Sequence, residues 1–112
     1  MTVLWLVIPC YNEEEVIRET AKRTLDVIHG LAAKGKISHE SKIAFVNDGS
    51  ADRTLSIIKD LCEKNNTFVC INLSRNRGHQ NALLAGLMTA KKYADAVISL
   101  DADLQDDIGA IE

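Results

Sequence analysis

The stretch VLWLVIPCYNEEEVI, residues 3–17, decides the expected fold of the chain. Its opening run, Val3–Ile8, is apolar at every position, which is typical of a parallel strand covered on both faces. Pro9 is expected to close this strand, and Asn12 is expected to cap a following helix over residues 13–33. A buried strand that leads directly into an amphipathic helix predicts a β-α-β unit.

The rest of the chain repeats this alternation of short apolar runs and amphipathic stretches. Further strands are expected at residues 43–46, 68–73 and 96–100, and further helices at 52–64 and 81–93. The helix at 81–93 is apolar nearly all round, so we expect it to be the most buried, with Gly86 allowing a close approach to the sheet. Asp106 and Asp107 are expected to begin a fourth helix. This order predicts the α/β class, as a Rossmann-like parallel sheet with helices on both faces.

Length, charge and cysteine spacing narrow the classes of function. The 112 residues are enough to bury one core of their own. A net charge of −3 without a basic run gives no electrostatic footprint for DNA or RNA, so we expect no nucleic-acid partner. The cysteines form no C-x-x-C pair, and their odd number favours a reducing compartment, so we expect a cytoplasmic location. The first apolar run is far shorter than the ~20 residues of a membrane span, and we expect neither a span nor a signal peptide in this chain.

Polar side chains follow each predicted strand, which is where an open parallel sheet binds its ligands. These are Glu13–Glu15 after the first strand, Asp48 after the second, Arg75 and Arg77 after the third, and Asp101 and Asp103 after the fourth. Acids take the place of a glycine-rich phosphate turn, which excludes a dinucleotide fingerprint and a P-loop. A divalent cation held by Asp101 and Asp103 would offset the charge of a diphosphate instead, because Mg²⁺ takes few protein ligands and several phosphate oxygens.

Four motifs, one after each predicted strand, resemble the GT-A nucleotide-sugar glycosyltransferases in order and spacing: PCYNEE, FVNDGSADRT, LSRNRGHQNALLAGL and DADLQDD. The likeness is greatest to the branch that moves a sugar onto a polyprenyl phosphate, such as the dolichol- and bactoprenol-phosphate glycosyltransferases. By this resemblance, residues 1–112 are expected to be the nucleotide-sugar-binding portion, the N-terminal half of a GT-A fold whose C-terminal part is missing. The resemblance implies a UDP- or GDP-type sugar donor, Mg²⁺ or Mn²⁺, and a polyprenyl phosphate or other glycan acceptor. The full-length enzyme would be anchored at the cytoplasmic face of a membrane.

The resemblance also implies which residues hold the nucleoside. Pro9, Tyr11 and Glu13 would line the nucleoside pocket, with Tyr11 near the base or the ribose. Asp48 would accept a hydrogen bond from the base. Arg75 would contact the base or a phosphate.

The cation and the catalytic group are placed by the same resemblance. Asp101 would face the ribose or the metal, and Asp103 with Gln105 would bind the cation that bridges the diphosphate. The general base that acts on the acceptor is expected beyond Glu112. The chain alone is therefore expected to bind the donor without completing the reaction.

The same residues are also compatible with simpler roles. Asp101 and Asp103 could be solvated acids that cap the next helix, and Asp48 could be an ordinary turn residue. Cys10 is expected to be a small buried hydrophobe rather than a nucleophile. Two rival classes are a metal- or nucleotide-binding module without turnover and a receiver-like phosphoacceptor domain. The receiver would need a lysine after a late strand, and none follows Leu100.

Overall fold

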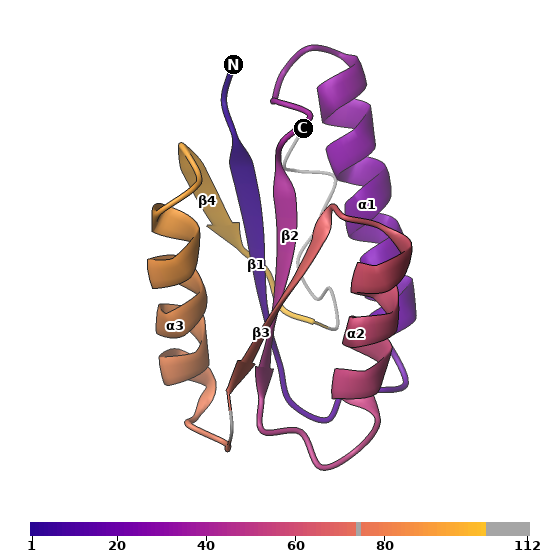
Figure 1. Ribbon diagram of the computed structural model, residues 1–112, viewed down its shortest axis with the longest axis vertical. Coiled ribbons are helices and arrows are strands. Elements are labelled where there is room, and N and C mark those ends of the chain that lie inside the picture. The colour runs from indigo at the N-terminus through magenta and orange to yellow at the C-terminus, as the bar shows by residue number, and fades with distance from the viewer. Residues whose placement is uncertain (74, 103–112) are drawn as a thin grey trace.

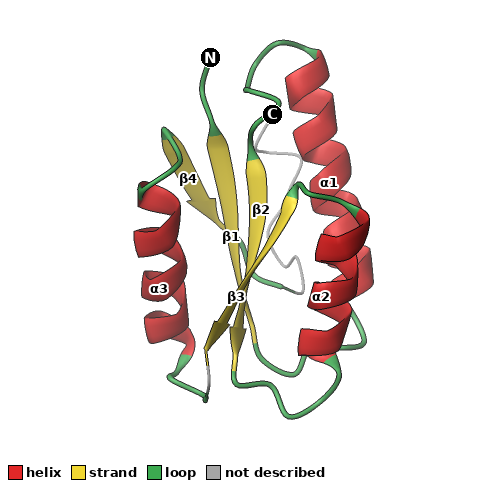
Figure 2. Cartoon of the chain, in the orientation of Figure 1, coloured by secondary structure: helices red, strands yellow, loops and turns green. Residues whose placement is uncertain are grey.

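The computed structural model describes residues 1–73 and 75–102, in which strands and helices alternate along the chain. In order they are β1 (Leu4–Cys10), α1 (Ile17–Ala33), β2 (Lys42–Asp48), α2 (Thr54–Lys64), β3 (Phe68–Leu73), α3 (His79–Lys91) and β4 (Ala96–Ser99) (Figures 1 and 2). This order confirms the predicted alternation. The helix expected from Asp106 lies outside the described residues. Within those residues, no helix combines the length and the apolar character needed to cross a lipid bilayer.

The strands form one parallel sheet in the order β3-β2-β1-β4. β1 lies between β2 and β4, with Val7 opposite Ala44 on one side and Ser99 on the other. The chain winds outward from β1 through β2 to β3, and then crosses back to place β4 on the far side of β1. The order therefore reverses between β1 and β4, and open α/β sheets bind ligands at such a switch point.

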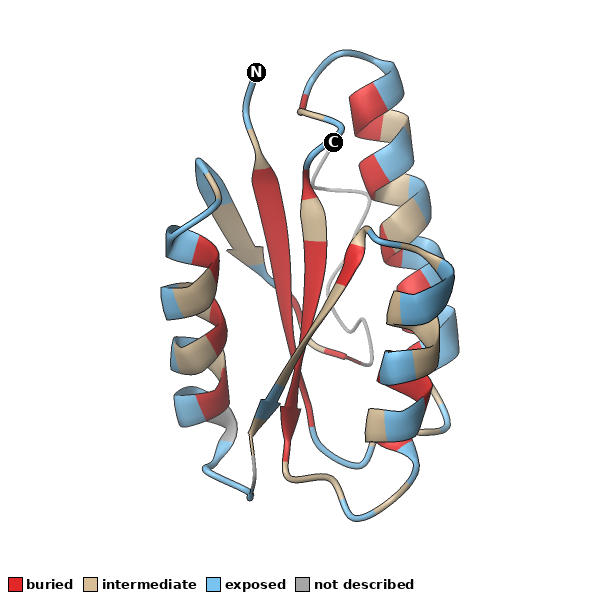
Figure 3. Cartoon of the chain, viewed as in Figure 1, coloured by how far each residue is buried: buried red, intermediate tan, exposed pale blue. Residues whose placement is uncertain are grey.

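Helices cover both faces of this sheet, as predicted. Figure 1 shows α1 and α2 on one face and α3 on the other. Side chains of β1 point alternately to the two faces of the sheet. Leu6 and Ile8 pack in the core beneath α1 and α2, whereas Trp5 and Val7 pack in the core beneath α3. Figure 3 shows every residue of β1 buried, as expected for a central strand with helices on both faces of its sheet.

Pro9 does not close the first strand; β1 continues through it to Cys10. The carbonyls of Val3 and Val7 accept hydrogen bonds from β4 and the residues that flank it. Backbone groups of alternate residues in a strand point to the same side, so the nitrogen of Pro9 also points toward β4. β4 ends at Ser99, opposite Val7. The missing N–H of Pro9 therefore interrupts no bond of that ladder, and the ring is tolerated inside the strand.

Asn12 is not the cap of the first helix. α1 begins at Ile17, and Val16 occupies the cap position without a side-chain hydrogen bond. Asn12 has a positive φ of 53°, which asparagine tolerates, and its side-chain oxygen accepts the N–H of Ala51 at 2.8 Å. The side chain that would have capped the helix instead binds the loop after β2.

α3 is not the most buried helix. Its buried positions are the small residues Ala82, Gly86 and Ala90, while Leu84 and Met88 are 54% and 61% exposed. In the described part of the chain α3 covers its face of the sheet without a neighbouring helix (Figure 1). Some of its other apolar residues therefore pack only partly against the core, and Leu84 and Met88 face outward. Apolar composition alone did not distinguish these two environments.

Gly86 brings α3 close to the sheet, as predicted. A Cβ atom at this position would lie 2.4 Å from Cγ1 of Val7 and 2.8 Å from Cγ2 of Val46. Both separations are far below van der Waals contact, so only glycine fits without movement of the helix or the strands.

Candidate functional site

The loops after β1 and β2 are held together by hydrogen bonds from backbone N–H groups to side-chain oxygens. The donors and acceptors are Asn12 to Ser50 (3.0 Å), Glu13 to Thr54 (2.8 Å), Glu14 to Asp52 (3.2 Å) and Ala51 to Asn12 (2.8 Å). Three of these bonds fix consecutive residues, 12–14, against the second loop. The segment that contains Tyr11 and Glu13 is therefore a fixed part of the carboxyl edge of the sheet.

Asp52 is the central acceptor between these loops. Its Oδ1 accepts the hydroxyl of Thr54 at 2.5 Å and the N–H of Thr54 at 2.9 Å, while Oδ2 accepts the N–H of Glu14. Partial desolvation acts to raise the pKa of Asp52, but the hydrogen bonds outweigh it and hold the pKa below its ordinary value of 3.8. The carboxylate is thus ionised and engaged from both loops.

Asp48 connects the end of β2 to the loop after β3. The residue is 3% exposed, and its Oδ1 accepts the N–H of Arg77 at 2.6 Å. Beside it, Gly49 has a φ of +67°, and a Cβ there would lie 2.2 Å from the backbone nitrogen of Asn76. The close approach of these two backbones requires glycine in this turn.

The chain after β4 returns to the same end of the sheet. The N–H of Leu100 donates to the carbonyl of Val7 at 3.0 Å, and the hydroxyl of Thr20 in α1 donates to the carbonyl of Ala102. Leu100 and Ala102 are 7% and 4% exposed and belong to the core beneath α1 and α2. Asp101, partly exposed, lies between these two anchored residues, beside the switch point of the sheet.

The nucleoside-binding residues expected from the sequence occupy different environments at this edge. Pro9 is buried at the end of β1, Tyr11 is 47% exposed and Glu13 is partly exposed. Asp48 is buried, and Arg75 lies exposed on the loop after β3. The hydrogen bonds and the close backbone contact above bring the loops after β1, β2 and β3 together.

The expected cation ligands are described only in part, since Asp103 and Gln105 lie outside the described residues. In residues 1–73 and 75–102, no three His, Cys, Asp or Glu side chains surround a common point. Asp101 nevertheless has the chemistry that the cation needs: a hard oxygen donor with access to solvent. Mg²⁺ is commonly held by one or two carboxylates together with substrate phosphates, so a single carboxylate such as that of Asp101 is compatible with a cation bound with a diphosphate.

Cys10 is a buried hydrophobe, as expected. It is 1% exposed, and its thiol donates to the carbonyl of Ile8 at 3.3 Å. Burial raises the pKa of the Cys10 thiol, and the nearby charge of Glu13 raises it further. A protonated thiol without access to solvent does not act as a nucleophile.

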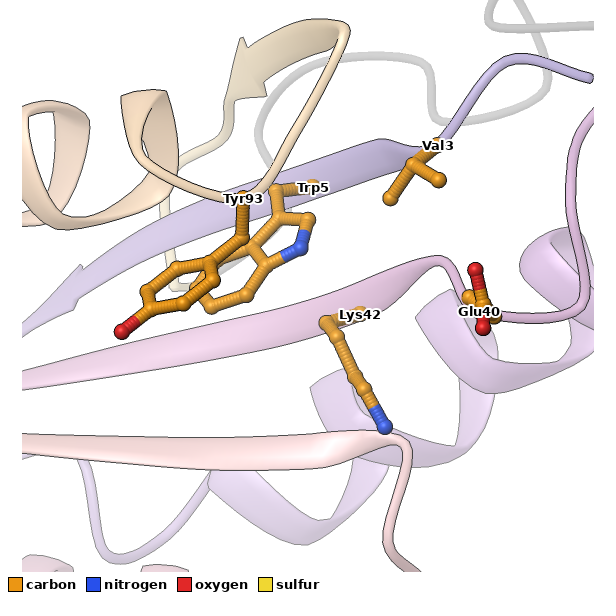
Figure 4. A pocket seen from close by; sticks show the side chains of 5 residues that line it. All are labelled: Val3, Trp5, Glu40, Lys42 and Tyr93. Carbon is orange, nitrogen blue, oxygen red and sulfur yellow. The ribbon is translucent and has the colours of Figure 1, made fainter.

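Two hollows lie at opposite ends of the sheet. One, of about 290 Å³, adjoins the loop after β1 and is lined by Asn12, Glu13, Glu14, Glu15, Val16 and Asp52. The other, of about 220 Å³, lies at the amino end and is lined by Val3, Trp5, Glu40, Lys42 and Tyr93 (Figure 4). There the rings of Trp5 and Tyr93 stack with centroids 5.5 Å apart, and the Lys42 ammonium donates to the carbonyl of Asn66 at 2.8 Å. The amino-end hollow shares none of the residues expected to bind a nucleotide.

Sequence reasoning missed the residues that hold the loops in place. Ser50, Asp52 and Thr54 follow the turn at alternate positions, a spacing typical of side chains that bond to nearby backbone N–H groups, and this signal could have identified them. Thr20 gave no comparable signal, because its partner Ala102 is 82 residues away in the chain.

The chain is similar over almost its whole length to known glycosyltransferases. The family model described as glycosyl transferase family 2 matches residues 5–112. An uncharacterized glycosyltransferase of Bacillus subtilis, YkoT, is 50% identical over 109 residues, which make up 97% of this chain and 32% of that protein. A prophage bactoprenol glucosyl transferase homolog of Escherichia coli is 42% identical over 106 residues, which make up 95% of this chain and 32% of that protein. The chain thus spans about a third of the length of these curated relatives.

A solved structure supports the fold independently. The mannosyltransferase PcManGT from Pyrobaculum calidifontis, in complex with GDP-Man and Mn²⁺, matches with a TM-score of 0.74 at 21% identity. The match covers 91% of this chain and 28% of that one, so the four parallel strands and three helices described here correspond to part of a GT-A structure. Since the family model covers far more than half of the sequence, the chain belongs to glycosyltransferase family 2.

Proposed function

We propose that the chain forms the donor-binding portion of a glycosyltransferase that moves a sugar from a UDP- or GDP-type donor to an acceptor, with a polyprenyl phosphate as the acceptor class. The observation that carries this proposal is the set of polar loops at the carboxyl edge of the sheet, beside the switch point between β1 and β4, in a member of family 2. The bactoprenol glucosyl transferase homolog supports the acceptor class. A lipid acceptor would place the full-length protein at the cytoplasmic face of a membrane.

The fixed loops supply the proposed nucleoside site. Tyr11, half exposed beside Pro9, would pack against the base or the ribose, and Glu13 would line the same pocket. The Oδ1 atom of Asp48 already accepts the N–H of Arg77, so Oδ2 is the atom we assign to the base. Arg75, exposed on the loop after β3, would reach the base or a phosphate.

The proposed reaction is direct displacement at the anomeric carbon. An acceptor oxygen attacks that carbon from the face opposite the leaving diphosphate, so that one C–O bond forms as the other breaks. Bound Mg²⁺ or Mn²⁺ would stabilise the charge that grows on the diphosphate. Asp101 would hold that cation, together with Asp103 and Gln105, which lie outside the described residues. The general base is assigned to the longer protein, beyond Glu112, so this chain binds and orients the donor.

The proposal is tested by thermal unfolding of the chain with a panel of nucleoside diphosphates, with and without Mn²⁺. A ligand that binds only the folded state stabilises it by about 2.7 kcal/mol at a concentration one hundred times its Kd. We expect a rise in Tm with UDP or GDP that requires the cation, and we expect Asp103→Asn to remove the cation-dependent part. Stabilisation by acetyl phosphate alone, without any effect of nucleotides, would instead favour the receiver-like alternative.

A further inference from the structure

Two buried threonines of α1 use their hydroxyls differently. Thr20 and Thr24 lie one turn apart and are 2% and 0% exposed. The hydroxyl of Thr24 bonds within its own helix, to the carbonyls of Thr20 at 2.8 Å and Ala21 at 3.1 Å. The hydroxyl of Thr20 leaves the helix and donates to the carbonyl of Ala102, which follows β4.

The bond from Thr20 has a specific effect on the chain around Asp101. Ala102 is 4% exposed, so its carbonyl is removed from water and depends on an internal donor. On the other side of Asp101, the N–H of Leu100 donates to the carbonyl of Val7 in β1. The backbone of Asp101 is therefore held between one bond to the sheet and one bond to α1, while the residue itself stays partly exposed.

We propose that Thr20 is a positioning residue, which orients Asp101 toward the cation and diphosphate of the donor through its bond to Ala102. This inference rests on the proposed donor-binding function and adds to it a residue from the buried face of α1. Thr20 is far too buried to touch the nucleotide, so its effect on binding passes through the backbone of residues 100–102.

The two threonines provide a matched pair of variants. Thr20→Val and Thr24→Val each replace a buried hydroxyl by a methyl group of similar size, but only Thr20→Val removes the bond to Ala102. Thr20→Ser keeps the hydroxyl and serves as the rescue variant. The measurement is the Kd of UDP and GDP by titration calorimetry, with and without Mn²⁺, and the readout is the ratio of the two values.

We expect the Mn²⁺ enhancement of nucleotide affinity to fall about tenfold or more in Thr20→Val, as is typical when a group that orients a metal ligand is removed. Thr24→Val and Thr20→Ser should keep the enhancement of the original chain, even if their Tm changes. If Thr20→Val does not fold, Thr20→Ala and Thr20→Ser give the same contrast, since both lose the methyl group and only serine keeps the hydroxyl.

The outcomes separate this inference from the function on which it rests. An equal loss of the Mn²⁺ enhancement in Thr20→Val and Thr24→Val, or no loss in either, would overturn the positioning role and leave donor binding intact. An original chain whose nucleotide affinity does not respond to Mn²⁺ would overturn the proposed function itself, and the role of Thr20 with it.

Discussion

At the scale of single residues, the carboxyl edge is organised by side chains that bind the backbone of another loop. Asp52 accepts hydrogen bonds from Thr54 and from the N–H of Glu14, and Asp48 accepts the N–H of Arg77. The bonds to Glu14 and Arg77 join segments that are distant in sequence. The two acids therefore hold the loops of the site together, in addition to giving the site negative charge. Removing one of them should therefore affect stability and binding together.

Asp52→Asn is expected to lower the free energy of unfolding by about 1 kcal/mol at neutral pH, because an amide cannot accept all the bonds that the carboxylate accepts. Because the pKa of Asp52 is lower in the folded state, its ionised carboxylate stabilises the fold at pH values above 3.8. This contribution to stability is lost as the pH falls through the lower pKa of the folded state. Urea unfolding at pH 7 and at acidic pH measures both effects. Compared with the original chain, the variant should have a lower free energy of unfolding at pH 7 and should lose less of it on acidification.

Asp60→Asn is the control for this prediction. The pKa of Asp60 is also lowered, by hydrogen bonds from Lys64 and Arg18, but these partners are surface side chains exposed to solvent. Exposed ion pairs contribute little to stability. Equal effects of Asp52→Asn and Asp60→Asn would contradict a framework role for Asp52.

At the scale of elements, the contact between α3 and the sheet depends on one glycine. Gly86→Ala would favour the isolated helix by about 1 kcal/mol, but its Cβ would overlap Val7 and Val46 and cost roughly 1–3 kcal/mol of packing. We expect a net loss of stability, measured by urea unfolding, that Val7→Ala partly restores in the double variant. Leu84→Ala, at a position 54% exposed on the same helix, should change stability little. A more stable Gly86→Ala variant would contradict the close packing.

The elements could be predicted from the sequence where local pattern decides them, and not where a distant neighbour does. Continuous apolar runs identified the four strands of the described residues, most clearly β1 and β2, which are buried along almost their whole length. Pro9, Asn12 and the burial of α3 were predicted wrongly. Pro9 is tolerated in β1 because β4 ends before it, and Asn12 binds Ala51 instead of capping α1. α3 is less buried than expected because no second helix lies beside it in the described chain (Figure 1). None of these features is encoded locally.

At the scale of the whole molecule, topology brings the site together. The crossing from β3 back to β4 puts Asp101 beside β1, whose loop carries Tyr11, although 90 positions of sequence separate the two residues. Sequence motifs predicted this edge because parallel strands all end on the same side. They could not predict the bond from Thr20 to Ala102, which depends on how the chain after β4 packs against α1.

The most direct test of the proposed donor site is a map of backbone amide shifts by NMR as UDP or GDP is added with Mg²⁺. We predict that shifts concentrate at Tyr11, Gly49, Arg75 and Asp101, at the carboxyl edge, and require the cation. The indole N–H of Trp5, in the amino-end hollow, should not move (Figure 4). Shifts centred on that hollow, with the carboxyl edge unchanged, would contradict the donor site proposed here.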